Sequence, residues 1–175
     1  ERSSTTRNVA ESMLRDKRHP RDRSETMIFN NYQAMEQLRH LKGQKITPEH
    51  ILELHRVITK DTLDDPADAG RLRDSDGVNV VDNRDRELLH QPPSFKELPE
   101  RLERLCVFAN ADLDSSPFVH PVVRAILLHF MIGYDHPFAD GNGRTARALF
   151  YWSMARSGYW LMEFLSISQF LRSAP

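Results

Sequence analysis

The sequence predicts a single all-α domain that carries one small β-hairpin. Apolar residues recur at helical spacing along most of the 175 residues, and glycine is scarce, with only 7 in the chain. One stretch, Gly70–Pro93, instead places valines among glycine, asparagine and aspartate and is closed by two prolines. No internal repeat or shift in composition marks a boundary, so residues 1–175 are interpreted as one domain.

The N-terminal part predicts two helices joined by a basic linker. A short helix is expected over Asn8–Arg15, and residues 17–23 are basic and interrupted by a proline. Ser24 is the expected N-cap of a second helix that runs to about His40. Residues 1–23 are therefore interpreted as an N-terminal helix and linker.

The middle of the chain contains two helix starts, one on each side of the expected hairpin. Thr47-Pro48-Glu49 combines a capping residue, a proline at the first helical position and an acid in the first turn. The helix that it opens should end before the aspartate-rich stretch 61–70. Ser94-Phe95-Lys96-Glu97 has the pattern of a capping box and is expected to open the next helix.

The C-terminal third predicts a central helix followed by two more. His120-Pro121 should begin a helix that runs to about Asp135, with apolar residues on nearly every face, as is typical of the buried centre of a bundle. His129 on this helix is interpreted as a core histidine and not as a zinc ligand. The last two helices are expected over Asn142–Ser157 and Leu161–Leu171.

Composition excludes several classes of protein. The chain has 24 basic and 25 acidic residues, and its formal charge of −1 does not favour a general nucleic-acid binder. The single cysteine, Cys106, excludes a disulfide framework and a cysteine-rich zinc site. The longest apolar stretch, near 125–134, is too short for a membrane span and no signal peptide is visible, so a cytoplasmic location is expected. The chain opens at Glu1 without a methionine, from which we expect a fragment of a longer protein.

The segment His136-Pro-Phe-Ala-Asp-Gly-Asn-Gly-Arg-Thr-Ala-Arg147 concentrates reactive and anion-binding groups between two apolar helices. Pro137 should end the first helix, and Gly141 and Gly143 supply a tight turn. The next helix starts near Asn142, and its first backbone N–H groups have no partner within the helix. A glycine turn that leads into a helix N-terminus is a site for anions such as phosphate.

Four side chains add chemistry to this predicted anion site. Arg144 and Arg147 stand at i, i+3, so they can reach phosphate oxygens from one helix face. Asp140 is a hard oxygen ligand suited to one Mg²⁺ ion, and His136 titrates near neutral pH and can accept a proton from a nucleophile. These are the parts of a phosphoryl-transfer site. A Walker A loop is excluded, because it would need glycine at Phe138 and lysine at Arg144.

The segment resembles the signature of Fic domains, which reads His-Pro-Phe, two variable positions, Gly-Asn-Gly-Arg, two variable positions and Arg. Residues 136–147 match every fixed position. The resemblance covers most of the chain: residues 120–134 look like the helix before the motif, 24–34 resembles an early helix, and 70–93 looks like the flap that docks the target. It implies a Fic-type helical bundle with a small β-hairpin flap.

The resemblance implies a protein adenylyltransferase, which transfers AMP from ATP to a Ser, Thr or Tyr hydroxyl of a target protein and releases pyrophosphate. His136 would be the general base, Asp140 would hold Mg²⁺ against the α- and β-phosphates, and Phe138 would be a buried anchor. Arg144 would bind the β- and γ-phosphates, and Arg147 the γ-phosphate. The implied nucleotide-binding residues are Gly141, Asn142, Gly143, Arg144, Thr145 and Arg147.

The same resemblance assigns target docking and regulation to two further segments. The flap backbone would pair with the target main chain as an added strand. The flap residues are Val78, Asn79, Val80, Val81 and Asp82. Many relatives carry an inhibitory segment whose glutamate pairs with the second motif arginine, here Arg147. Residues 1–7 are similar to the end of that segment, with Arg2 in place of glycine, so Glu1 is either the inhibitory glutamate or an ordinary terminal acid.

Two other functions stay open at this point. Some Fic-fold enzymes transfer another phosphate-containing group or act as kinases, although the presence of both arginines favours AMP transfer. A non-catalytic regulatory module is the second alternative, and the intact His136 and Asp140 argue against it. The expected partner is a protein with a hydroxyl side chain, which includes the chain itself. Family members often form homodimers, and neither nucleic acid nor a membrane is expected as a partner.

Overall fold

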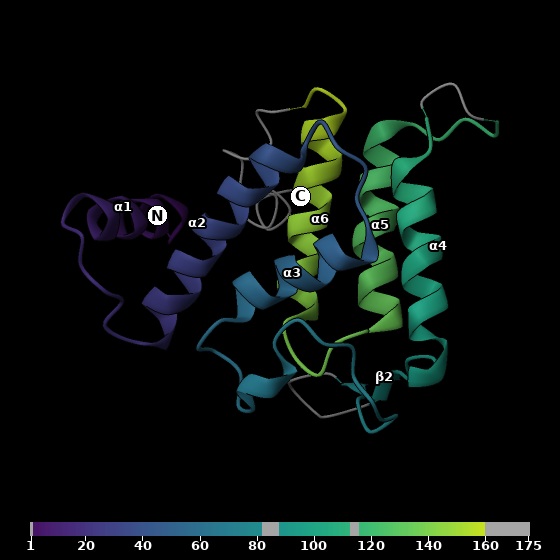
Figure 1. Ribbon diagram of the computed structural model, residues 1–175, viewed down its shortest axis with the longest axis horizontal. Coiled ribbons are helices and arrows are strands. Elements are labelled where there is room, and N and C mark those ends of the chain that lie inside the picture. The colour runs from purple at the N-terminus through teal and green to yellow at the C-terminus, as the bar shows by residue number, and fades with distance from the viewer. Residues whose placement is uncertain (1, 82–87, 113–115, 160–175) are drawn as a thin grey trace, which may run out of the picture.

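The structure, a computed structural model, describes residues 2–81, 88–112 and 116–159. It confirms a helical fold with one small antiparallel hairpin (Figure 1). The helices of the described residues are α1 (Arg2–Arg15), α2 (Arg23–Leu41), α3 (Pro48–Thr59), α4 (Leu98–Asn110), α5 (Pro121–Asp135) and α6 (Asn142–Arg156). The hairpin and the short 3-10 turns are β1 (Val80–Val81), β2 (Leu88–His90), η1 (Pro66–Asp68) and η2 (Phe95–Glu97).

The core is built around the neighbouring helices α5 and α6. Figure 1 shows α4, α5 and α6 standing side by side, with α3 lying across them and α1 set apart beside α2. Apolar side chains from all of these helices except α1 fill the centre, and burial of each large one contributes about 1.5–3 kcal/mol. The fully buried members include Leu54, Ile58, Leu105, Leu128, Ile132, Leu149 and Trp152. This packing brings the last turn of α3 against the loop that joins α5 to α6.

Local capping explains where two helices begin and corrects one prediction. Thr47 caps α3 as predicted, because its hydroxyl accepts a hydrogen bond from the backbone N–H of His50. The cap of α2 is Asp22, whose carboxylate accepts from the N–H of Glu25 at 2.8 Å, and not Ser24. Aspartate and serine are equally good caps, so the sequence pattern alone did not distinguish them.

The predicted capping box at residues 94–97 is wrong. Ser94 makes no capping bond; its hydroxyl donates instead to Asp76 Oδ2 at 3.0 Å, and α4 begins only at Leu98, after the turn η2. Asp76 Oδ1 also accepts from the backbone N–H of Phe95 at 2.6 Å. A carboxylate from the other end of the hairpin segment therefore takes the place that the capping pattern assigned to Ser94.

The expectation that α5 is buried on all sides is also wrong. Ala125, Leu128 and Ile132 face the core, whereas a second apolar face is open. The exposed residues of that face are Val123, Ile126, Leu127, Phe130 and Tyr134. His129 is likewise exposed and is not a core residue.

Two further expectations concern the ends of the chain. α1 begins at Arg2, ahead of the predicted start at Asn8, while the predicted helix Leu161–Leu171 lies outside the described residues. Over the ranges that the structure describes, no helix has both the length and the apolar character needed to cross a bilayer.

Candidate active site

His136 ends α5 in a left-handed backbone conformation, with φ 44° and ψ 57°. Its Nδ1 lies 3.2 Å from the carbonyl oxygen of Gly133. A carbonyl can only accept, so Nδ1 carries the proton and Nε2 presents a lone pair. Burial lowers the pKa of His136, and the nearby guanidinium of Arg73 acts in the same direction. The ring is therefore neutral at pH 7, with Nε2 able to accept a proton.

The loop after His136 is fastened by Phe138 and Asn142. Phe138 is fully buried, and its ring stacks on the imidazole of His55 with the ring centroids 3.8 Å apart. The Asn142 amide makes both hydrogen bonds of a peptide group: Oδ1 accepts from the Phe138 N–H at 2.9 Å, and Nδ2 donates to the Phe138 carbonyl at 2.8 Å. The Asn142 side chain is thus committed to the loop, so only its backbone N–H can serve an anion.

His55 of α3 is a buried connector that the sequence analysis missed. Its Nδ1 accepts a hydrogen bond from the Gly70 N–H at 2.9 Å, so the ring proton is on Nε2, which donates to the Asp140 carbonyl at 2.8 Å. Burial lowers the pKa of His55, which keeps the ring neutral and this pattern intact. One signal could have found it: His55 follows Leu54 and precedes Ile58 on the apolar stripe of α3, where a histidine needs buried partners.

Gly141 holds the loop tightly against α3. Its φ is 83°, and a Cβ there would lie 2.6 Å from Thr59 Cγ2 and 3.0 Å from His55 Nε2, so only glycine fits. The first hydrogen bond of α6 runs from the Thr145 N–H to the Gly141 carbonyl, which places the N–H groups of residues 142–144 at the positive end of the helix dipole. Thr145 is itself fully buried, and its hydroxyl donates to Gly141 O at 3.1 Å. Its side chain therefore supports the turn from behind and does not line the surface.

Three charged side chains gather in front of this helix terminus. The Asp140 carboxylate, 60% exposed, receives the Gly141 N–H on Oδ1 at 2.5 Å and Arg144 Nη2 on Oδ2 at 3.0 Å. Arg144 is held further by its bond from Nη1 to Thr62 Oγ1 at 2.9 Å, and burial lowers its pKa. Arg147 is exposed, and its Nη1 lies 3.5 Å from the position a Cβ would take on Gly143. The structure thus brings together the acid and both arginines that the sequence singled out.

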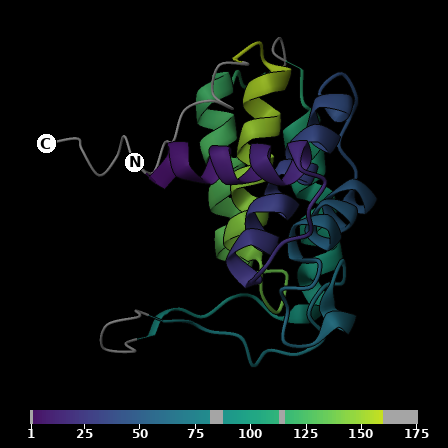
Figure 2. The same ribbon diagram turned by 90° about the vertical axis from the view of Figure 1, so that its left-hand side faces the viewer.

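The hairpin β1–β2 extends from the lower end of the bundle, as Figure 2 shows. Its strands pair Val80 with His90 and Val81 with Leu88, with an irregular register between the two pairs. Val78 and Val80 are half-buried and Asn79 is exposed. The predicted flap residue Asp82 and the predicted regulatory residue Glu1 lie outside the described residues.

His90 attaches the hairpin to α5. Its Nε2 lies 2.8 Å from the carbonyl oxygen of Tyr134, and the two rings are 4.3 Å apart between centroids. Tyr134 is the second-last residue of α5 and lies two residues before His136, so the second hairpin strand is fixed close to His136. A hairpin anchored at this point can present its backbone edge beside the candidate base.

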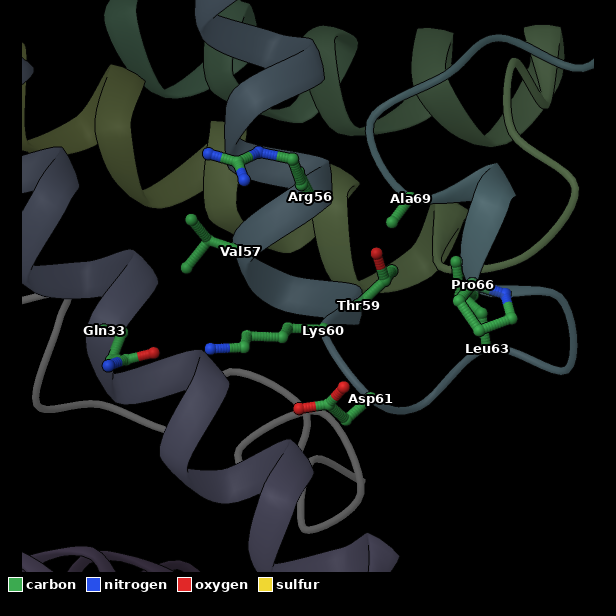
Figure 3. A pocket seen from close by; sticks show the side chains of 9 residues that line it. All are labelled: Gln33, Arg56, Val57, Thr59, Lys60, Asp61, Leu63, Pro66 and Ala69. Carbon is green, nitrogen blue, oxygen red and sulfur yellow. The ribbon is translucent and has the colours of Figure 1, made fainter.

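A separate cavity of about 340 Å³ lies between α2, α3 and the η1 segment (Figure 3). Thr59 lines it, but His136, Asp140 and Arg144 do not. Within the described residues, no group of three or more His, Cys, Asp or Glu side chains is arranged to hold a metal ion. A metal in the charged site would therefore depend on Asp140 together with ligands from a substrate.

Comparisons with known proteins agree with this geometry. The model of the "Fic/DOC family" matches residues 45–154, which include α3, the hairpin, α4, α5 and most of α6. The protein adenylyltransferase Fic of Nematostella vectensis is 38% identical over 119 residues, which cover 67% of this chain and 25% of that protein. The protein adenylyltransferase fic-1 of Caenorhabditis elegans is 34% identical over 129 residues, 70% of this chain and 23% of that protein. The chain therefore spans about a quarter of the length of these curated relatives.

Solved structures share the fold. Fic-1 from C. elegans (residues 134–508) superimposes with a TM-score of 0.66 at 25% identity and covers 89% of this chain and 46% of that one. A Fic family protein from Desulfovibrio desulfuricans G20 gives a TM-score of 0.69 at 21% identity and covers 97% of this chain and 50% of that one. With the family model matched across most of the helical core and the motif loop fastened between α5 and α6, this chain belongs to the Fic/DOC family.

Proposed function

We propose that the chain carries the catalytic centre of a protein adenylyltransferase, which transfers AMP from ATP to a hydroxyl group of a target protein. One observation carries the proposal: the Nδ1–H of His136 is bonded to the Gly133 carbonyl, which leaves Nε2 as a proton acceptor, and the loop after His136 leads into the N-terminus of α6, a kind of site that binds phosphate. The relatives named protein adenylyltransferase support the same reaction. Because the chain spans only part of those relatives, the reaction is proposed from the site itself.

The proposed nucleotide site uses the backbone and the two arginines. The N–H groups of 142–144 would bind phosphate oxygens, and Arg144 and Arg147 would bind the outer phosphates from the same face of α6. Thr145 is reassigned to a supporting role, since its hydroxyl is already bonded to Gly141. With the outer phosphates on the two arginines, the α-phosphate would be the group that faces His136.

A single Mg²⁺ ion fits this site. Mg²⁺ is commonly held by one or two carboxylates together with substrate phosphates, and Asp140 supplies one accessible carboxylate beside the proposed phosphate position. Such an ion, when bound, neutralises charge on the phosphates. The Arg144 guanidinium, which bonds to Asp140, would contribute to the same charge balance.

The proposed reaction uses His136 as the base. Nε2 accepts the proton of the target hydroxyl, and the hydroxyl oxygen forms a bond to the α-phosphorus. The bond between the α-phosphorus and the oxygen that bridges to the β-phosphate breaks, and pyrophosphate leaves. The Nδ1–H bond to Gly133 holds the imidazole orientation and stabilises the charged ring that results.

The target would be an extended protein segment. A two-stranded sheet leaves an unpaired backbone edge on each strand, and an added strand from another protein can hydrogen-bond to it. Pairing to the flap would bring one Ser, Thr or Tyr hydroxyl toward His136 without a deep side-chain pocket. Residues 78–81 are the described part of this proposed docking edge.

A labelling experiment tests the proposed reaction. The protein is incubated with Mg²⁺, a cell lysate as the pool of targets, and ATP that carries the label on either the α- or the γ-phosphate. We expect protein labelling from the α position alone, lost by a factor of about 10² or more in His136→Ala. His40→Ala, an exposed histidine in the last turn of α2, is the matched control and should label normally. Labelling from the γ position alone would instead make the protein a kinase.

A further inference from the structure

We propose that Arg73 is a positioning residue that couples the hairpin to the backbone of His136. The inference rests on the proposed function, in which the hairpin positions the target and His136 accepts the proton of the target hydroxyl. No motif or spacing in the sequence points to Arg73. Its side chain is only 2% exposed, and it bonds to both parts at once.

On the side of the motif, Arg73 binds two consecutive carbonyl groups. Its Nε donates to the His136 carbonyl and its backbone N–H donates to the Pro137 carbonyl, both at 2.9 Å. His136 is in the left-handed conformation, which costs a non-glycine residue free energy and persists where neighbouring groups fix it. The two bonds from Arg73 hold the peptide planes directly after the candidate base.

On the side of the hairpin, the same guanidinium fastens both ends of the segment. Nη1 donates to the Ser75 carbonyl at 2.7 Å, before β1, and Nη2 donates to the Pro93 carbonyl, after β2. Nη1 also lies 3.1 Å from Asp76 Oδ1, and Asp76 in turn binds Phe95 and Ser94 beyond the hairpin. The two ends of the hairpin are therefore tied to one side chain.

The chemistry of arginine suits this role. A planar guanidinium offers five N–H donors in fixed directions, and Arg73 directs them to carbonyls on three different segments. A lysine at this position would offer three donors from one point and would not reach all three. A buried charge is costly, and apolar packing of the same volume would often be more stable, so fold stability alone does not account for this residue.

The geometry has a mechanical consequence. If the two ends of the hairpin move, Arg73 moves with them and shifts the carbonyl of His136. A change in the turn at His136 shifts the hairpin in the same way. The position of the target hydroxyl is thereby linked to the position of Nε2. The proposed nucleotide site at the N-terminus of α6 is held by other contacts. His55 bonds to the Asp140 carbonyl, and Asn142 bonds to Phe138, so ATP binding should not depend on Arg73.

The test compares Arg73→Gln and Arg73→Lys with a matched control, Arg71→Gln. Arg71 is exposed, two residues away, and its ion pairs among the described residues are with exposed or half-exposed acids, Asp68 at 3.2 Å and Asp74 at 3.5 Å. Both Arg73 variants keep the backbone bond to Pro137, so they change only the side-chain links. Three quantities are measured: α-label transfer to lysate proteins, ATP affinity by calorimetry, and amide hydrogen exchange of residues 88–90.

We expect both Arg73 variants to lose label transfer by about 10²-fold, because misplacement by about 1 Å has an effect of that size. ATP affinity should stay within about twofold, and exchange at 88–90 should become about tenfold faster. The control should match the wild type in all three quantities. Normal transfer in Arg73→Gln would overturn the inference, and so would equal losses of transfer and ATP affinity, which a merely structural residue would cause.

A second variant and a readout that does not need activity distinguish failure of the inference from failure to fold and from failure of the proposed function. If Arg73→Gln does not fold, Asp76→Asn weakens the same junction from its half-exposed side and should shift transfer and exchange in the same direction. If the wild type transfers no α-label, the proposed function fails, and hydrogen exchange still decides on Arg73. Faster exchange at 88–90 in Arg73→Lys than in the control Arg71→Gln supports the coupling, and equal exchange contradicts it.

Discussion

Replacing Gly141 with alanine gives the sharpest test of how the loop 136–141 is held against α3. Two separate effects act at this position. The backbone has φ 83°, and an L side chain in that region costs about 1–2 kcal/mol. The new Cβ would also lie 2.6 Å from Thr59 Cγ2, and overpacking of this kind costs about 1–3 kcal/mol. Gly141→Ala should therefore lower the free energy of unfolding by about 2–5 kcal/mol.

Two other glycines separate these effects. Gly158 has φ 90° but nothing within 4 Å of its Cβ position, so Gly158→Ala should cost only the backbone part, about 1–2 kcal/mol. Gly133 lies inside α5 with no neighbour within 4 Å, so Gly133→Ala should stabilise the protein by about 0.5–1 kcal/mol. Urea unfolding of the three variants measures all three values.

Gly141→Ala should also weaken ATP binding at the proposed nucleotide site. The Gly141→Ala methyl would also lie 3.0 Å from His55 Nε2, the atom that donates to the Asp140 carbonyl. We expect ATP affinity to fall by about tenfold, which is about 1.4 kcal/mol. The reasoning is refuted if Gly141→Ala destabilises the protein no more than Gly158→Ala, or if ATP affinity is unchanged.

Three further predictions concern the same site. His55→Phe keeps the ring stack on Phe138 but leaves the Gly70 N–H and the Asp140 carbonyl unpaired, so urea unfolding should show a loss of about 2–4 kcal/mol; a loss below about 1 kcal/mol would contradict the connector role. Because burial lowers the pKa of His136 from 6.5, the neutral base persists to lower pH. The rate of α-label transfer should stay level from pH 8 down to 6.5 and fall only below that, and a midpoint above 6.5 would count against it. Asp140→Asn should lower transfer by about 10²-fold and chelation of divalent ions should abolish transfer in the wild type, whereas transfer that survives chelation would exclude the proposed Mg²⁺.

Much of the fold could be predicted because its signals are local. Helix starts at Thr47-Pro48 and His120-Pro121, the turn at Gly141, and the hairpin between Gly70 and Pro93 all follow from residues that are close in sequence. The predicted site residues between His136 and Arg147 lie together for the same reason, since one loop and one helix turn carry them. The structure adds that the side chains of Asn142 and Thr145 are used within the loop.

The parts that could not be predicted depend on partners far away in sequence. His55 and the Asp140 carbonyl are 85 positions apart, and Arg73 and the His136 carbonyl are 63 positions apart. No pattern in a single sequence indicates which distant carbonyl a buried side chain will meet. The same limit explains Ser94, whose partner Asp76 lies across the hairpin, and the exposed face of α5, because hydrophobicity does not reveal which faces find a neighbour.

The protonation of His136 is the property on which the proposed mechanism depends most directly. Nitrogen NMR of the protein labelled at histidine, with the His136 signals assigned by comparison with His136→Ala, reports which ring nitrogen carries the proton. We predict a neutral ring at pH 7 with the proton on Nδ1, bonded to the Gly133 carbonyl, and an unprotonated Nε2. A proton on Nε2, or a charged ring at pH 7, would contradict the account, because His136 could not then accept the proton of a target hydroxyl.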